Sequence, residues 1–346
     1  MLKKLRFALI LAIAVSLITI PVSAFADDFT GDAGNPALIR PAAGTLNVTR
    51  SAEDAPATGW VRKGGKLYYY TSDGKLYSGK GWATIDGAKY YCLGSGIFAT
   101  SPTQIPTKVT VSKKVKYKVK VRKKGKKKYK TKYKTVKTTE NQKPFYMFGS
   151  DGKLITKSGV FTYDGKEYFG AGKGMLKTGW VASGNTAMYF DKKTCAMAKD
   201  TTVGYLKIPA NGRLGKAYAL GIKKLNSTKW TLRQAYKNSY KLKYRNRGFR
   251  RKTSEAYAIR GFTTGTGNCY VMAATFYIQA KLLGYDVHQV KGKVARRYPH
   301  SWTVIKQNGK EWVYDPNFKN ETGRNGWKIY YGKKGTWKYT NKKKMN

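Results

Sequence analysis

Acidic residues, histidine and cysteine are all scarce in this chain. Its 346 residues include 68 Lys and Arg against 18 Asp and Glu, which gives a formal net charge of +50. Three cysteines, Cys92, Cys195 and Cys269, are too few and odd in number for the disulfide framework of a small secreted fold, although Cys92 and Cys195 could still pair. Two histidines among scattered cysteines give no metal-ligand spacing, so neither a metal nor another cofactor is expected.

The only long apolar run lies at the N-terminus. Lys3, Lys4 and Arg6 precede an apolar run over 7–20, and Ala24-Phe25-Ala26 follows it. This order is typical of a secretory signal peptide cleaved after Ala26. No later run has the length of a transmembrane helix, and the C-terminus shows no sorting signal. We therefore expect a secreted mature chain without a transmembrane segment, attached to the cell wall non-covalently.

The excess of basic residues predicts association with polyanions. Inside a cell, nucleic acid would be the expected partner of such a chain. Because the signal peptide predicts export, we expect envelope polymers or other anionic glycans instead, and no nucleic acid.

Composition divides the chain into three parts after the predicted signal peptide at 1–26. Residues 27–58 are rich in Ala, Gly, Pro and Thr and carry few large apolar side chains, so a disordered linker is expected there. Residues 59–204 are rich in Gly, Lys and paired aromatic residues. A boundary with Pro209 and several glycines follows. Helical and strand patterns then continue to the end, so residues 205–346 are expected to form a separate domain.

Residues 59–204 contain an internal duplication. The sequence DGKLYSGKGWATIDGAKYYCLGSGIFAT at 73–100 aligns without a gap with DGKLITKSGVFTYDGKEYFGAGKGMLKT at 151–178, and 12 of 28 positions are identical. Asp-Gly pairs recur in both copies, and this dipeptide favours tight hairpin turns. A lone hairpin is barely stable in water, so the units are expected to stack their aromatic residues as a small β-solenoid.

Gly-Trp steps, aromatic pairs and Asp-Gly recur in order, as in GWVRKGGKLYYYTSDGKLYSG. The pattern resembles the cell-wall-binding repeats of Gram-positive surface proteins, of the choline-binding and glucan-binding type, over about 60–100 and 144–198. The resemblance implies that aromatic rings of adjacent hairpins cage a quaternary ammonium group or stack on sugar rings. The aromatic residues at these places are Trp60, Tyr69, Tyr70, Trp82, Tyr90, Tyr91, Tyr168, Phe169 and Trp180. Val160 replaces Trp82 in the second copy, which weighs against choline, and the rings could instead only hold the solenoid together.

A lysine-rich segment at about 108–139 separates the two copies. Sixteen of its 32 residues are basic. Val and Tyr alternate with Lys on both sides of KKGKKK, and this period of two predicts an inserted β-hairpin. We expect one face to be a lysine ladder and the other to carry Val and Tyr. Such a run is usually only a solvated face, but its density and regularity favour salt-sensitive adhesion to an anionic polymer.

Helical patterns precede strand patterns after residue 205. Thr231-Leu232-Arg233-Gln234 is typical of a capping box, and Ser254 is expected to cap a second helix. A third helix, apolar almost all round, is expected to begin at Cys269 and to end at Gly284. Strands are predicted at 285–294, 300–306, 311–315 and about 327–331. This order predicts an α+β domain with its own core.

Cys269 stands where the glycine-rich sequence GTGN meets the apolar helix. A lone cysteine at such a place is more often a core residue than a catalytic one. The first turn of a helix nevertheless offers unpaired N–H groups and a positive potential, which stabilise a thiolate. The backbone N–H of Cys269 could also contribute to an oxyanion hole.

A base and an orienting carboxylate for this thiol can come from the strands that follow. His300 opens HSWTVIK, and Asp315 ends the next strand in EWVYDPNF. Adjacent antiparallel strands would place the two side by side, so that Asp315 polarises His300 and His300 deprotonates Cys269. The other histidine, His288, is expected to be a surface residue. Trp302 and Trp312 are either cleft walls or core residues.

The order G-x-C, LLGY, V-x-G, H-S-W-x-x-V and G-x-x-W-x-x-x-D-P is similar to that of the transglutaminase-like superfamily over about 229–318. The resemblance implies a papain-like fold with a catalytic triad of Cys269, His300 and Asp315, in which Ser301 replaces a frequent alanine. The expected fold is therefore an aromatic β-hairpin repeat solenoid followed by an α+β, papain-like or transglutaminase-like domain.

These features together predict a secreted, cell-envelope-associated cysteine acyl-transfer enzyme acting on peptide or carboxamide bonds. A peptidase or amidase, in which water resolves the thioester, is favoured over a cross-linking transglutaminase, in which an amine does. Expected partners are cell-wall polymers or other anionic glycans, bound by the repeats and the Lys-rich hairpin, and a peptide or protein substrate. The alternative is a non-catalytic surface protein that binds cell wall or polyanions and whose triad has lapsed.

Overall fold

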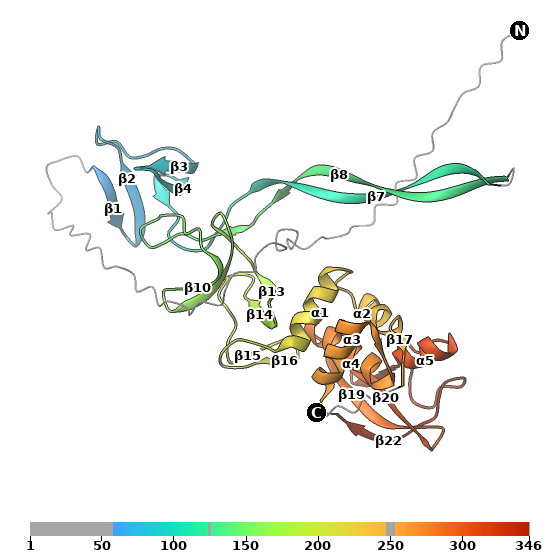
Figure 1. Ribbon diagram of the computed structural model, residues 1–346. Helices are drawn as coiled ribbons and strands as arrows, with labels where there is room; N and C mark the ends of the chain where they lie inside the picture. The colour runs from blue at the N-terminus through green and yellow to red at the C-terminus, as the bar shows by residue number, and fades with distance from the viewer. Residues whose placement is uncertain (1–57, 124–125, 247–252, 346) are drawn as a thin grey trace, which may run out of the picture.

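A computed structural model describes residues 58–123, 126–246 and 253–345 of the chain. The predicted signal peptide at 1–26 and all but the last residue of the predicted linker at 27–58 lie outside the described residues. Figure 1 shows a run of β-hairpins, a long two-stranded ribbon that projects from it, and a C-terminal part of helices and strands. Within the described ranges, no helix is long and apolar enough to cross a membrane.

Short antiparallel strands form the first part of the molecule. Two five-stranded sheets, with the orders β1-β2-β5-β4-β3 and β10-β11-β12-β9-β6, are followed by the hairpins β13-β14 and β15-β16. The strands are β1 (Gly59–Lys63), β2 (Lys66–Tyr70), β3 (Gly81–Ile85), β4 (Ala88–Gly94), β5 (Ile97–Phe98), β6 (Thr103–Gln104), β9 (Phe145–Tyr146), β10 (Ser158–Tyr163), β11 (Lys166–Ala171), β12 (Met175–Leu176), β13 (Gly179–Ser183), β14 (Thr186–Phe190), β15 (Thr201–Val203) and β16 (Leu206–Ile208). The hairpin β15-β16 lies where the sequence predicted only a boundary.

The internal duplication recurs in the backbone. Strands β3, β4 and β5 correspond to β10, β11 and β12 of the second copy. Asp86 and Gly87 have φ values of 50° and 76° in the first hairpin turn, and Asp164 and Gly165 have 49° and 69° in the second. Both residues of such a turn need positive φ, which aspartate and glycine tolerate. The predicted Asp-Gly hairpins are confirmed at these two places.

Aromatic residues face one another across the hairpins. Trp60 pairs with Tyr69 and Trp180 with Tyr189, with ring centroids 4.8 and 5.1 Å apart. Rings also meet between neighbouring hairpins, because Trp60 lies 4.5 Å from Tyr90. Such tilted and edge-on pairs stabilise a sheet beyond the area they bury. Stacking between units therefore supplies the core that single hairpins lack.

The three cysteines are all free and buried. Cys92 belongs to one hydrophobic cluster of the repeats and Cys195 to another. Burial raises the pKa of the Cys195 thiol to about 12, with a smaller contribution from the charge of Asp191. Cys92 and Cys195 therefore do not form the disulfide that the sequence left open.

The inserted segment forms the ribbon of β7 (Thr107–Lys123) and β8 (Lys126–Gln142), which twists as it leaves the repeats in Figure 1. Seventeen residues in each strand correspond to a length of about 55 Å. The hairpin prediction is confirmed. The expected division into a lysine face and a Val/Tyr face is wrong.

The register explains that error. Lys123 pairs with Lys126, so odd-numbered residues of β7 lie opposite even-numbered residues of β8. Val119 is therefore opposite Lys130, and Lys120 is opposite Tyr129. Because directly opposed residues share a face, each face carries lysines from one strand and neutral side chains from the other.

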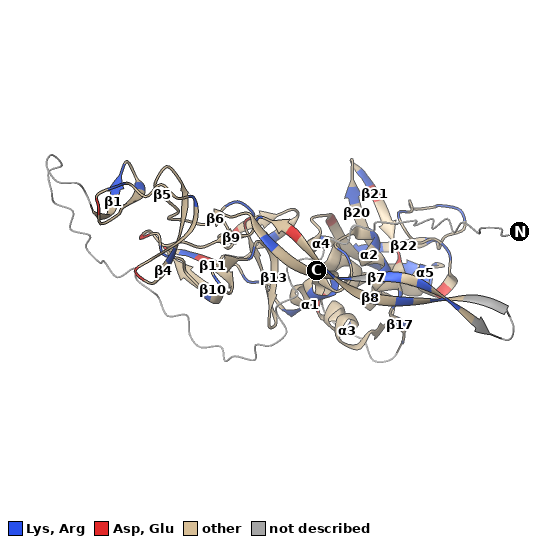
Figure 2. Ribbon diagram, turned by 90° about the horizontal axis from the view of Figure 1, so that it is seen from above, with Lys and Arg blue, Asp and Glu red and all other residues tan. Residues whose placement is uncertain are grey.

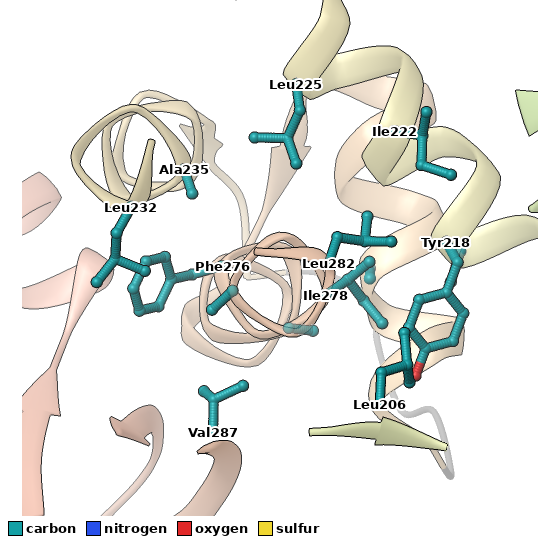
Figure 3. Packing of buried hydrophobic residues seen from close by; sticks show 14 of the residues in the cluster. Leu206, Tyr218, Ile222, Leu225, Leu232, Ala235, Phe276, Ile278, Leu282 and Val287 are labelled. Atoms are coloured by element: carbon teal, nitrogen blue, oxygen red, sulfur yellow. The ribbon is translucent and has the colours of Figure 1, made fainter. Parts of the chain in front are cut away.

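The C-terminal part packs helices on a four-stranded antiparallel sheet of order β21-β20-β19-β22. Figure 3 shows α4 between side chains of α1, α2 and β19, with Phe276, Ile278 and Leu282 of α4 in the centre. The elements are α1 (Lys216–Asn226), α2 (Leu232–Tyr240), β17 (Lys243–Tyr244), α3 (Ser254–Thr264), β18 (Thr266–Gly267), α4 (Cys269–Leu282), β19 (Asp286–Val294), β20 (Tyr298–Gln307), β21 (Lys310–Tyr314), α5 (Pro316–Thr322) and β22 (Tyr339–Lys344).

Local details of this part differ from the sequence predictions. The Thr231 side chain accepts a hydrogen bond from the backbone N–H of Gln234, but the Gln234 amide donates to Asn238, so only half of the capping box forms. Thr253 caps α3, and Ser254 is its first residue. The strand predicted at about 327–331 is reduced to an isolated bridge between Val313 and Ile329.

Candidate active site

Cys269 is the first residue of α4, and the Asn268 side chain caps that helix by accepting from the N–H of Val271. The helix therefore begins at the predicted residue, and the sulfur lies where the helix dipole favours negative charge. The thiol is buried, with 8% of Cys269 exposed. The Gln289 amide of β19 donates to the carbonyl oxygen of Tyr270 over 3.0 Å. This bond fixes the first turn of α4 on the sheet.

His300 lies on β20 and is buried. Its Nε2 donates to Oδ2 of Asp315 over 2.7 Å, which leaves Nδ1 for other partners. Cys269 acts on the imidazole as a hydrogen-bond partner and through its charge. The three predicted site residues are therefore brought together, from the start of α4, from β20 and from the residue after β21.

The electrostatics of this group favour an imidazolium. Burial by itself would lower the pKa of His300. The negative charge of Asp315, its hydrogen bond and the contribution of Cys269 act in the opposite direction and raise the pKa of His300 above its ordinary range. Tyr339 shares the same buried surroundings, and burial followed by the Asp315 charge raises its pKa as well. A positive charge on His300 would favour an anion on a neighbouring sulfur, and the anion is the form of sulfur that attacks a carbonyl.

Asp315 is fully buried and held from several sides. Its Oδ1 accepts from the N–H of Phe318, which caps α5, and its Oδ2 accepts from the hydroxyl of Tyr339 over 2.9 Å. The backbone of Asp315 donates to Gly326 and accepts from the hydroxyl of Tyr236. A Cβ added at Gly326 would lie 2.3 Å from the Asp315 carbonyl oxygen. Glycine at 326 is therefore a condition for the position of the carboxylate.

Sequence reasoning missed two aromatic residues near the end of the chain. Tyr339 of β22 donates to Asp315, and the rings of Trp337 and His300 are nearly perpendicular, with their centroids 4.7 Å apart. The pairing of β22 with β19 brings Tyr339 to the site, and Trp337 lies two residues before it. Gly292 permits that close pairing, since a Cβ there would lie 2.5 Å from the carbonyl oxygen of Thr340. In GTWKYTNKKK, the aromatic residues Trp337 and Tyr339 alternate with polar residues. This alternation was the signal that could have predicted a strand there.

Ser301, which stands where the transglutaminase-like superfamily often has alanine, takes part in a hydrogen-bond network. Its hydroxyl accepts from the Gln289 amide over 2.8 Å and donates to the carbonyl oxygen of Val290. Gln289 is the residue that also binds the first turn of α4. Ser301 thus belongs to the network that connects the strand of His300 with the helix of Cys269.

An exposed tyrosine also lies near the thiol. Strand β17 pairs in parallel with β18, just before Cys269, and ends at Tyr244. Burial and then the charge of Cys269 raise the pKa of Tyr244. Tyr244 is 44% exposed, so an exposed phenol lies within electrostatic reach of the thiol.

The remaining residues named from the sequence have other surroundings. His288 of β19 is half-buried, and burial lowers its pKa. Trp302 is fully buried and donates to the hydroxyl of Tyr331, so it is a core residue. Trp312 instead helps to line an open cavity of about 660 Å³ at the other end of β20 from His300. The cavity lining is Tyr205, Gly284, Tyr285, Asp286, Lys306, Gln307, Asn308, Lys310, Trp312 and Lys328.

The predicted ligand-binding aromatics of the repeats differ in accessibility. Tyr90 and Tyr168 are 2% and 5% exposed and belong to hydrophobic clusters, so their rings pack the repeats. Trp82 is 45% exposed. The partly buried members are Trp60, Tyr69, Tyr70, Tyr91, Phe169 and Trp180. In the described part of the chain, no cluster of His, Cys, Asp and Glu has the arrangement of a metal site.

Comparison with known proteins gives similarities at the level of solved structures only. No model of a protein family matches the chain, and no curated protein matches it either. Among solved structures, the chain is similar to CbpF in complex with ipratropium, with 22% identity, a TM-score of 0.25, and coverage of 45% of this chain and 38% of that one.

Two further similar structures have comparable scores. Choline binding protein F from Streptococcus pneumoniae, in the presence of a peptidoglycan analogue, shows 23% identity, a TM-score of 0.19, and coverage of 45% of this chain and 46% of that one. A multimodular pneumococcal cell wall endolysin from phage Cp-1, complexed with choline, shows 16% identity, a TM-score of 0.24, and coverage of 47% and 39%. The chain thus spans less than half the length of these proteins. At such TM-scores the similarity assigns neither fold nor function, and the hairpin architecture rests on the strand registers given above.

Proposed function

We propose that this chain is a cysteine acyl-transfer enzyme of the cell envelope, with Cys269 as the nucleophile, His300 as the acid and base, and Asp315 as the group that orients the imidazole. One observation carries the proposal: a buried imidazole is bonded to a buried carboxylate through Nε2 and has the thiol at the start of α4 as its other partner. This combination is the recognised requirement for an activated nucleophile. The transglutaminase-like, papain-like assignment of residues 205–346 belongs to the same proposal.

The proposed chemistry proceeds in two steps. The Cys269 thiolate attacks a peptide or carboxamide carbonyl, and the N–H groups at the start of α4 stabilise the oxyanion. His300 gives its proton to the departing amine, which leaves an acyl thioester on the sulfur. An incoming water or amine then loses a proton to His300 and attacks the thioester, which releases the acyl product and restores the thiolate.

Hydrolysis is favoured over cross-linking. A transglutaminase must keep water away from its thioester long enough for an amine to react. Tyr244, whose pKa is influenced by Cys269, is 44% exposed, and this exposed neighbour supports a reaction with water. The proposed activity is therefore that of a peptidase or amidase.

The repeats supply the proposed attachment to the envelope. Trp82 is 45% exposed and lies edge-on to Tyr91 and Tyr146, an arrangement that offers an aromatic surface to a sugar ring or a quaternary ammonium group. Cell-wall polymers are the proposed ligands, and peptides in or near the wall are the proposed substrates.

A non-catalytic wall-binding protein is the second candidate function. It is favoured by the burial of Cys269, of which only 8% is exposed, and by the position of the 660 Å³ cavity away from the thiol. In this alternative, the Cys269–His300–Asp315 group is a buried polar cluster of the core.

Mass spectrometry of a peptide library and of purified peptidoglycan peptides, incubated with the full chain, tests the enzymatic proposal. Hydrolysis adds one water to a cleaved peptide, and cross-linking removes one ammonia for each bond formed. We expect hydrolysis by the natural chain, none by Cys269→Ala, and an unchanged rate with Cys92→Ala as the matched control. Products that persist with Cys269→Ala would contradict the assignment.

Alkylation by iodoacetamide separates the two candidate functions without a known substrate. The alkylation rate at Cys269 is compared between the natural chain, His300→Gln and His288→Gln, because all three chains contain this thiol and differ only in one histidine. We expect a decrease of about tenfold or more in His300→Gln only. Equal rates in all three chains would favour the non-catalytic alternative.

A further inference from the structure

The β7–β8 ribbon carries basic side chains on both of its faces. On one face, Lys116, Lys118 and Lys120 of β7 lie opposite neutral residues of β8. On the other face, the lysines belong to β8 and lie opposite neutral residues of β7: Lys130, Lys132 and Lys134. All six of these lysines are exposed, and Figure 2 shows blue segments along both strands.

This distribution has a physical cause. Like charges directly opposite each other in an antiparallel pair destabilise it. The register avoids such pairs in this stretch, because each lysine faces Val, Tyr or Thr. The same register places one row of lysines on each face, with successive lysines of a row about 6.6 Å apart.

Acidic side chains do little to offset this charge. Glu140 is the only acidic residue in the sequence from 107 to 142, and it forms an ion pair with Lys113 near the base of the ribbon. The two rows of lysines lie further along the strands. They are therefore available to an external anion.

We infer that the ribbon binds a linear, densely charged polyanion along both faces at once. A flat anionic surface such as a lipid bilayer could engage only one row of lysines. A flexible chain, or two chains on opposite sides, can place anionic groups against both rows of lysines. One polymer chain would thus wrap around the ribbon, or the ribbon would bridge two chains. This inference extends the proposed association with the cell envelope, and it does not depend on Cys269.

The experiment uses the full chain and long-chain sodium polyphosphate as the probe, with affinity measured over a series of salt concentrations. Two triple variants remove one row each: Lys116→Gln with Lys118→Gln and Lys120→Gln, and Lys130→Gln with Lys132→Gln and Lys134→Gln. Each should reduce the slope of log K against log salt by about 2, at about 0.7 per lost contact. The combined variant should lose about twice as much.

Two controls make the result specific. Lys229→Gln, Lys237→Gln and Lys241→Gln remove the same charge from exposed sites outside the ribbon and should leave the slope nearly unchanged. Replacing either ribbon row with arginine keeps the charge and should keep the slope, which separates lost contacts from a disturbed fold.

Other outcomes would overturn the inference. If only one row affects the slope, a single face binds. If the chain binds vesicles of phosphatidylglycerol and phosphatidylcholine but not polyphosphate, the ligand is a membrane surface. If neither probe binds, or if the outside-ribbon control loses as much slope as the ribbon variants, the ribbon is not a polyanion site.

Discussion

The repeats and the C-terminal part differ in how far apart in sequence their decisive contacts lie. In the hairpin β10–β11, Val160 pairs with Phe169, and the turn between them is made by two adjacent residues, Asp164 and Gly165. In the candidate active site, Asp315 contacts Tyr236 and Tyr339, which lie 79 and 24 residues away. The repeats are therefore specified locally, whereas the site depends on the whole C-terminal part being folded.

The same substitution should have a large effect in the C-terminal part and little effect in the repeats. The largest such contrast is expected from Asp→Asn. Asp315→Asn keeps the shape and the cap of α5 but removes the charge that holds His300 protonated. We expect a loss of activity of about 10²–10⁴-fold and of about 3 kcal/mol in the free energy of unfolding. Asp164→Asn, in a turn that asparagine also tolerates, should change neither.

The pH dependence of stability checks the same pair. The pKa of His300 is raised in the folded chain, so the stabilisation by the charged pair is fully present below the ordinary histidine pKa of about 6.5. It is lost as the pH rises through the raised value. Urea unfolding between pH 6 and alkaline pH should show a steeper decline in the natural chain than in Asp315→Asn, in which only buried tyrosines such as Tyr339 still lose stability. An identical decline in both chains would contradict the prediction.

A smaller contrast is expected from Gly→Ala. Gly326→Ala places a methyl group against the Asp315 backbone, and overpacking of this kind costs about 1–3 kcal/mol. At Gly165, which has a φ of 69° and nothing within 4 Å of an added Cβ, only backbone strain opposes alanine, at about 1 kcal/mol. Activity should fall with Gly326→Ala and persist with Gly165→Ala. If both variants retain activity, Gly326 does not fix the carboxylate.

The smallest effect concerns Tyr339, which we expect to be a positioning residue. Tyr339→Phe removes one hydrogen bond to Asp315, worth about 1 kcal/mol. The alkaline limb of the pH–activity profile should move by a measurable fraction of a pH unit, with little change in KM. Tyr133→Phe, at a 65% exposed position of the ribbon, is the matched control. A KM effect without a change in the pH profile would indicate a substrate-binding role instead.

The contrast also explains what the sequence could predict. Asp-Gly turns and paired aromatics indicate hairpins because both signals are local, and Cys269 begins α4 as expected because Asn268 caps it. Strand β22 and Tyr339 were missed, since their place depends on pairing with β19 about 50 residues earlier. The mixed faces of the ribbon were missed for a related reason: alternation within a strand does not fix the register between strands.

The titration of the two histidines by NMR is the most direct test of the central claim, that sulfur, imidazole and carboxylate are coupled. His288→Gln assigns the signals. We predict a pKa below the ordinary value for His288, where burial dominates, and a pKa above it for His300, which falls in Cys269→Ala and falls further in Asp315→Asn. A His300 that titrates in the ordinary range, or that does not respond to Cys269→Ala, would contradict the account.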